Sequence, residues 1–166
     1  MLGDVLVQLV PDRAMQIRNM TLDDLGAVTA LWDACGLTRP WNDLEQDIRF
    51  ALAGPASTGL VGLADSTVMA ALLVGHDGHR GSVYYVGVHP DRRGHGFGGR
   101  IMAAAEDWLR AEGVWKLNLL VRKDNDDVLR FYQALGYADQ ETISLGKRLD
   151  GRPDRAAPDV AAENQP

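Results

Sequence analysis

The sequence predicts a mixed α/β (α+β) fold in one domain. Segments with helical periodicity alternate with short apolar runs that are bounded by turn residues. Three strand-like runs follow one another after two helical segments, which favours antiparallel hairpins, whereas a later helix separates two strands and requires them to be parallel. With 166 residues, 46% of them hydrophobic, the chain is long enough to bury one core.

The first elements are a short strand and two helices. Residues 16–20 read as the strand, and Thr21 is a favourable N-cap for a helix over 22–35, whose apolar residues recur at helical spacing. Asn42, followed by Glu45, resembles a capping box and predicts the start of a second helix.

The middle of the chain predicts a meander followed by a crossover. Residues 58–63 and 68–74 form a hairpin-like pair, and a turn-rich link leads to a third strand over 82–88. A helix over 98–112 then connects to a strand over 115–121, which must run parallel to its predecessor if the crossover is right-handed.

The C-terminal part predicts one more helix, from Asp124 to Leu135, and a last strand region over 137–149. We expect the domain to span 15–149, with 1–14 as an N-terminal extension. Residues 150–166 lack periodicity and are expected to be a disordered tail.

Composition excludes several functions. A net charge of −6 argues against binding to nucleic acid and suits a cationic partner such as an amine. Cys35 is the single cysteine, so no internal disulfide framework forms, and its place on an apolar helical stripe favours a core role. The lack of a leader or of a long apolar run predicts a cytoplasmic protein without a membrane span. The turn over 76–79 offers no complete ligand set, so no metal is expected there, and hydrogen bonds are expected to fix this turn instead.

A glycine-rich turn joins the strand over 82–88 to the next helix. Residues 94–99 match the dinucleotide fingerprint G-x-G-x-x-G, but 89–94 intervene after the strand, and two helices with a hairpin precede it, which disfavours a Rossmann fold. A phosphate-binding Walker loop is disfavoured because no Gly-Lys-Ser/Thr follows. Amides at the start of a helix favour an anion, and Arg93 adds a planar, charged donor.

The motif Arg93-x-x-Gly96-x-Gly98 resembles the pyrophosphate-binding signature of the GCN5-related N-acetyltransferase (GNAT) superfamily. The order of elements is also similar, and Asn125 with Phe131-Tyr132-Gln133-Ala134-Leu135-Gly136-Tyr137 resembles later motifs of that superfamily. Four segments look more narrowly like the YpeA-type acetyltransferases of bacteria: 39–43, 75–82, 124–126 and 145–149. The resemblance covers residues 15–149.

This resemblance implies a GNAT fold with about four helices around a mostly antiparallel sheet, whose parallel central pair splays around an acyl-CoA site. It also implies acetyl-CoA as cosubstrate and direct transfer of the acetyl group to a primary amine in a ternary complex. Tyr132 matches the tyrosine that protonates the departing thiolate, as a phenol with an ordinary pKa of about 10 can do. The cofactor-binding residues implied are Val86, Gly87, Val88, Arg93, Gly94, His95, Gly96, Phe97, Gly98, Gly99, Asn125 and Tyr132.

The acceptor side is less defined. Many GNAT proteins place a glutamate base on the strand before the signature, whereas residues 82–85 here are Ser-Val-Tyr-Tyr. A water chain, Tyr84 or Tyr85, or a carboxylate such as Asp43 or Asp77 are the alternatives for the base. By resemblance Trp41 walls the acceptor site, although it also suits an anchor of its loop. The missing glutamate keeps open a catalytically silent acyl-CoA-binding or sensing module, and a homodimer also stays open.

Overall fold

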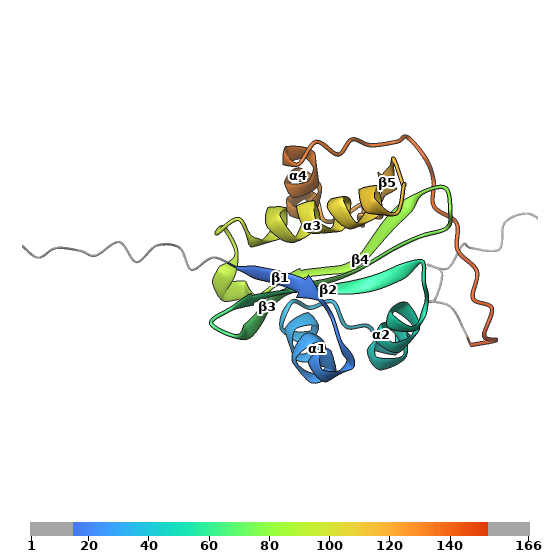
Figure 1. Ribbon diagram of the computed structural model, residues 1–166. Helices are drawn as coiled ribbons and strands as arrows, with labels where there is room; N and C mark the ends of the chain where they lie inside the picture. Colours follow the sequence, from blue (N-terminus) through green and yellow to red (C-terminus); the bar gives the residue numbers. More distant parts are fainter. Residues whose placement is uncertain (1–14, 153–166) are drawn as a thin grey trace, which may run out of the picture. The chain divides into compact units, whose positions relative to one another are not determined.

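The structure is a computed structural model that describes residues 15–152, drawn in colour in Figure 1. The predicted N-terminal extension over 1–14 and most of the predicted tail, 153–166, lie outside the described residues. The described chain forms two compact units, residues 15–38 with 43–120 and residues 39–42 with 121–152. No helix within 15–152 has the length and apolar character needed to cross a membrane.

A five-stranded mixed sheet forms the centre of the first unit. Its order is β1-β2-β3-β4-β5, with antiparallel neighbours except for the parallel pair β4 and β5. The strands are β1 Gln16–Asn19, β2 Ser57–Ala64, β3 Thr67–His76, β4 Gly81–Val88 and β5 Leu117–Asn118. The predicted meander and parallel crossover are therefore confirmed, although β5 has two residues where seven were expected.

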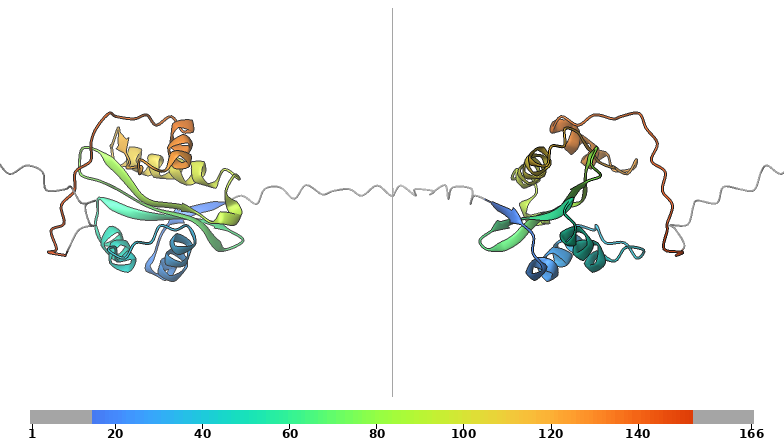
Figure 2. Two further views of the ribbon diagram at one scale, coloured as in Figure 1. Left: turned by 180° about the vertical axis from the view of Figure 1, so that it is seen from behind. Right: turned by 45° about the vertical axis from the view of Figure 1, so that its right-hand side comes forward.

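Helices cover both faces of this sheet. α1 (Leu25–Ala34) and α2 (Leu44–Ala53) lie on one face and α3 (Phe97–Ala111) on the other, as Figure 1 and the turned views of Figure 2 show. α1 follows a short 3-10 turn, η1 (Leu22–Asp24), and a second one, η2 (Pro90–Arg92), precedes α3. η2 and the glycine-rich turn therefore connect the end of β4 to the start of α3.

The core fills the space between each helical layer and the sheet. On the side of α1 and α2, fully buried Trp32, Val28 and Ile48 pack over Val61 and Ala71 of the central strands. On the other side α3 buries an apolar stripe that comprises Phe97, Ile101, Met102, Ala105 and Leu109. Because β2 and β3 are covered on both faces, long parts of them are buried without alternation.

The predicted start of the second helix is corrected by one residue. Asp43, not Asn42, is the N-cap of α2, because its Oδ1 accepts a hydrogen bond from the Gln46 N–H at 3.0 Å. Glu45 is instead engaged along the helix, where it pairs with Arg49 at 2.7 Å.

The second unit contains α4 (Asp126–Ala134) and an extended segment. The prediction of a last strand over 137–149 is wrong, since no strand forms there within the described residues. Local bonds compete with sheet pairing: the Glu141 N–H donates to Asp139 Oδ1 at 2.8 Å, and Glu141 has φ of 51°. The apolar residues that suggested the strand, Ile143 and Leu145, are 85% and 91% exposed.

Candidate active site

The glycine-rich turn presents main-chain amides at the start of α3. Gly96 is the N-cap, and the first intrahelical bond joins the Arg100 N–H to the Gly96 carbonyl at 3.1 Å. The amides of Phe97, Gly98 and Gly99 therefore precede the helical ladder, as the first N–H groups of every helix do. The Phe97 side chain is 3% exposed and anchors α3 in the core, so only its main chain can meet a ligand. Unpaired main-chain amides at the start of a helix favour the binding of an anion.

Two glycines shape this turn by their backbone conformation. Gly94 and Gly96 have φ of 76° and 77°, in the left-handed region that other residues adopt at a cost. A Cβ at either position would meet no atom within 4 Å. Conformation rather than crowding thus explains both glycines.

A β-bulge interrupts β4 just before the turn. The register passes from Leu73 opposite Tyr84 to Ala71 opposite Gly87, so Tyr85 and Val86 together face a single residue of β3. Tyr85 adopts φ of 54°, which is uncommon for an aromatic residue. The sequence suggested a bulge or a close approach at Gly87, and the structure places the bulge one residue earlier, at Tyr85 and Val86.

Gly87 is explained by the close approach of α1 and the loop after it. A Cβ there would lie 3.0 Å from Cδ1 of Trp32, 3.2 Å from Cδ1 of Leu37 and 3.3 Å from Sγ of Cys35. Trp32 is fully buried, so it has little room to retreat. The glycine lets the bulged strand lie directly on the indole.

The main-chain groups of Val88 point toward the open side of β4. The His89 N–H donates to the Met69 carbonyl of β3 at 2.8 Å, so in an antiparallel ladder the preceding Val88 directs its N–H and C=O away from β3. Alternation gives Val86 the same direction. Pairing with β5 is limited to Gly81 and Ser82, which leaves this stretch of β4 without a β5 partner.

Cys35 supports the same stretch from α1. Its thiol donates to the Val88 carbonyl at 3.2 Å, and burial raises the pKa of the thiol, although the neighbouring Arg93 acts in the opposite direction. The thiol therefore keeps its proton at neutral pH and packs in the core, as the sequence predicted. Because Arg93 neighbours this thiol, its side chain lies near the end of β4. His95 lies beside them, with its Nδ1 2.9 Å from the Arg93 carbonyl.

Three further predicted residues lie in the second unit. Asn125 caps α4, since its Oδ1 accepts a hydrogen bond from the Val128 N–H at 3.3 Å. Tyr132 is 7% exposed and packs edge-on against Phe131 and Tyr137, and burial raises its pKa to about 12. The Trp41 carbonyl accepts a hydrogen bond from Arg148 at 3.1 Å, while the residue stays 38% exposed.

The carboxylates considered as bases are engaged elsewhere. Asp43 caps α2, and Asp77 Oδ1 accepts from the N–H groups of His79 and Arg80 at 2.8 and 2.7 Å. These main-chain bonds from Arg80 and His79 lower the pKa of Asp77, which makes it a weaker base. They also fix the turn, as predicted. Tyr84 is 55% exposed.

Tyr85 has a partner that the sequence did not single out. Its hydroxyl donates to Oδ2 of Asp47 on α2 at 2.7 Å, and its ring stacks on Trp32 with centroids 4.8 Å apart. Asp47 sits in the first turn of α2, where an acidic residue is expected for the helix dipole alone. Nothing in the sequence relates it to a tyrosine 38 residues later.

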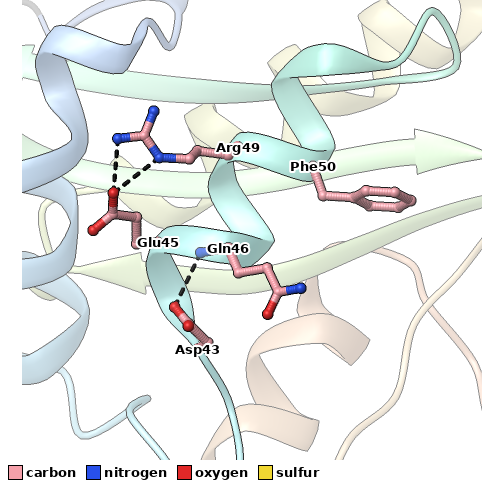
Figure 3. Close-up of a pocket in the computed structure, with 5 residues that line it drawn as sticks. All are labelled: Asp43, Glu45, Gln46, Arg49 and Phe50. Atoms are coloured by element: carbon pink, nitrogen blue, oxygen red, sulfur yellow. Dashed lines mark hydrogen bonds and ion pairs between the residues drawn. The ribbon is translucent and has the colours of Figure 1, made fainter. Parts of the chain in front are cut away.

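A shallow depression lies along the outer side of α2 (Figure 3). Asp43, Glu45, Gln46, Arg49 and Phe50 line it, and Phe50 is 84% exposed. Among the predicted site residues only Asp43 takes part. The depression is thus separate from the turn and the bulge described above.

No group of three or more histidine, cysteine, aspartate or glutamate side chains within the described residues could hold a metal ion.

The first unit is a mixed α/β fold in which a bulged strand leads through a glycine-rich turn into a helix, and comparison with known proteins identifies its family. A model of the Acetyltransferase (GNAT) family matches residues 25–137. An acetyltransferase of Yersinia pestis is 47% identical over 135 residues, covering 81% of this chain and 96% of the relative. An acetyltransferase of Pectobacterium atrosepticum is 44% identical over the same shares of both chains.

Solved structures share the fold. The aminoglycoside N-acetyltransferase AAC(6')-Iy, solved with a bisubstrate analogue, aligns with a TM-score of 0.71 at 18% identity, over 81% of this chain and 98% of its own. The chain belongs to the Acetyltransferase (GNAT) family. It is an N-acetyltransferase that uses acetyl-CoA as its cosubstrate.

Proposed function

We propose that the protein transfers the acetyl group of acetyl-CoA directly to a primary amine within a ternary complex. The observation that carries this proposal is the continuity of bulge and turn: the open side of β4 and the amides of α3 belong to one run of chain. A thioester and a pyrophosphate are the two ends of a ligand that such a run can hold together.

In this proposal the turn holds the pyrophosphate. The amides of Gly94 to Gly99 and the guanidinium of Arg93 face the anion, with His95 beside them. The main-chain groups of Val86 and Val88, which point away from β3, pair with the pantetheine arm. Acetyl-CoA supplies an activated acetyl group, and a main-chain N–H of the bulge stabilises the oxyanion that develops on its carbonyl.

Tyr132 serves as the general acid in this proposal, and Asn125 contacts the cosubstrate. Because burial raises the pKa of Tyr132 to about 12, the phenol holds its proton at neutral pH. A proton donor near the departing thiolate improves a leaving group whose conjugate acid has a pKa of about 8.5. Packing against Phe131 and Tyr137 fixes the ring.

The acceptor is a primary amine on a small molecule, a peptide amino terminus or a lysine side chain. We assign Trp41, Asp43, Tyr84 and Tyr85 to the surface that receives it. The net charge of −6 favours approach of a cationic acceptor. Direct transfer is favoured over a covalent acyl-cysteine route because Cys35, the one cysteine, keeps its proton and donates a hydrogen bond to the Val88 carbonyl.

A panel of four acceptors tests the proposal. Consumption of acetyl-CoA is followed with spermidine, neamine, a peptide with a free amino terminus and a lysine-containing peptide with a blocked terminus. Acetylation of at least one is expected, with an initial-rate pattern that requires both substrates to be bound. If calorimetry detects acetyl-CoA binding while every acceptor fails, the alternative of a silent acyl-CoA-binding module gains instead.

We further propose that residues 15–149 act as one cytoplasmic domain that forms a homodimer. Ile143, Leu145 and Leu149 are at least 85% exposed, and the two-residue spacing of Ile143 and Leu145 would place both on one face of an added strand. A second copy of the chain is the partner we propose for this segment. Light scattering tests it, with Leu145→Lys expected to convert dimer to monomer.

A further inference from the structure

We infer that Tyr85 and Asp47 form the acceptor side of the reaction, with Tyr85 contacting the acceptor nitrogen and Asp47 positioning Tyr85 and taking up the proton that is released. The inference rests on the proposed amine acetyltransferase function. In this inference Asp47 of α2 replaces the glutamate base that β4 lacks, and it acts on the acceptor through the Tyr85 hydroxyl.

Tyr85 belongs to β4, the strand that holds the thioester in the proposed function. Tyr85 is itself part of the bulge, directly before Val86 and Val88, whose main-chain groups face the open side of β4. Its positive φ of 54° sets it apart from the regular strand. The side chain is only partly buried, so part of its surface remains accessible. No other described tyrosine is this close in sequence to those main-chain groups and also hydrogen-bonded to a carboxylate.

Contacts from α1 and α2 hold the Tyr85 side chain in place. The ring is stacked on fully buried Trp32 of α1 at 4.8 Å, with an interplanar angle of 24°. The hydroxyl donates to Asp47 Oδ2 of α2 at 2.7 Å. Asp47 is tied into the first turn of α2, where its N–H donates to the Asp43 carbonyl at 2.9 Å. A group fixed in this way is pre-organised for the reaction.

The hydrogen bond to Asp47 determines whether the Tyr85 hydroxyl can donate or accept a hydrogen bond with a substrate. A phenol has one donor, and here that donor is used by the carboxylate. Toward a substrate, the phenol oxygen can therefore act only as a hydrogen-bond acceptor. An amine N–H is the matching donor, and the bond strengthens when the nitrogen becomes positively charged during attack.

The proton balance follows from this polarity. The acceptor enters as a neutral amine, because carboxylates are much weaker bases than amines and Asp47 cannot deprotonate a free ammonium ion. The nitrogen lone pair forms the C–N bond while the carbonyl π pair moves to oxygen. When that pair returns, the C–S bond breaks and the thiolate takes a proton from the general acid. The surplus proton on nitrogen, now strongly acidic, passes to the Tyr85 oxygen as the Tyr85 proton passes to Asp47.

Single and double variants of the full chain test the pair with the fastest of the four acceptors. Tyr85→Phe keeps the ring and its stacking, and Asp47→Asn keeps the shape of the side chain. Each is expected to lower kcat by about 100-fold, within the usual range for acid–base groups, with the KM for acetyl-CoA unchanged. The double variant is expected to be no slower than Tyr85→Phe, because both residues act on one proton.

Binding supplies a readout that does not depend on turnover. In calorimetry with the protein saturated with CoA, Tyr85→Phe is expected to weaken the amine about fivefold, as the loss of one hydrogen bond would. Asp107→Asn, the same chemical change on the exposed side of α3, is the matched control and is expected to leave kcat and amine affinity unchanged.

The outcomes separate the two proposals. A kcat for Tyr85→Phe within threefold of the parent, or effects of the two variants that multiply, overturns the inference while the acetyltransferase function stands. If Asp47→Asn does not fold, Tyr85→Phe decides alone. A parent protein that binds acetyl-CoA but acetylates none of the four amines overturns the proposed function and this inference together.

Discussion

Replacing Gly87 by alanine tests whether the close contact between β4 and α1 has the cost that the geometry implies. The new Cβ would lie 3.0 Å from Trp32 Cδ1, with Leu37 and Cys35 at 3.2 and 3.3 Å. Trp32 is fully buried and stacked on Tyr85, so the indole cannot move aside without disturbing the bulge. Gly87→Ala should therefore lower both stability and activity.

The magnitude combines two opposing effects. Overpacking of a well-packed core costs about 1–3 kcal/mol, and the reduced freedom of the unfolded chain offsets roughly 0.4–1 kcal/mol of that. A net loss of about 1–2 kcal/mol remains. For a chain of this length, that loss lowers Tm by roughly 2–8 °C.

Thermal unfolding followed by circular dichroism measures this loss, with Gly26→Ala as the control. Gly26 lies exposed at the start of α1, and a Cβ there would meet nothing within 4 Å. Alanine at this position should raise stability by roughly 0.5 kcal/mol because of helix propensity and the unfolded state. The reasoning is refuted if Gly87→Ala is as stable as the parent, or if both variants shift Tm in the same direction.

Three further predictions concern substitutions at Asp24, Tyr132 and Gly96. Asp24 accepts two hydrogen bonds from Arg18, which lower the pKa of its carboxyl group to about 2. The stabilisation from this ion pair is present above pH 4 and is lost as the pH falls toward 2. Asp24→Asn should therefore lower the free energy of unfolding in urea by about 1 kcal/mol at pH 7, a value discounted because Arg18 is 42% exposed, and by almost nothing near pH 2. Tyr132→Phe should lower kcat about 10- to 100-fold with calorimetric acetyl-CoA affinity within twofold, and the parent's acid function should persist to about pH 11, since burial raises the pKa of this phenol to about 12. Gly96→Ala, at φ of 77°, should cost about 1 kcal/mol in urea unfolding and weaken acetyl-CoA binding, whereas an unchanged dissociation constant would contradict the role of this turn.

The elements that the sequence predicted well are those with strong boundary signals. α3 was expected over 98–112 and spans Phe97–Ala111, because Gly96 and Gly113 mark its ends and an apolar stripe runs between them. Local chemistry was sufficient there. The glycine-rich turn was located for the same reason, since its glycines and Arg93 are contiguous in the chain, and its binding of pyrophosphate stays a prediction.

The errors arise where long-range packing decides. The residues over 137–149 include apolar positions that suit a strand, yet the described chain gives them no partner strand, and side-chain bonds at Asp139 and Glu141 favour turns. The bulge was harder still to locate. Its positive φ falls on Tyr85, an aromatic residue that carries no turn signal, whereas Gly87 attracted the prediction for a different reason.

The bulge persists because the helices on one face of the sheet stabilise a backbone that the strand alone would avoid. A left-handed conformation at Tyr85 costs about 1–2 kcal/mol. Stacking on Trp32 returns roughly 0.5–1.5 kcal/mol, and a hydrogen bond to the Asp47 carboxylate about 1.5–3 kcal/mol. Gly87 admits the indole that makes this possible. The same contacts that hold the bulge leave the main chain of Val88 directed at the open side of β4. In the function that we propose, this side receives the thioester, so the stability of the α1 and α2 face and the binding of acetyl-CoA depend on the same few residues.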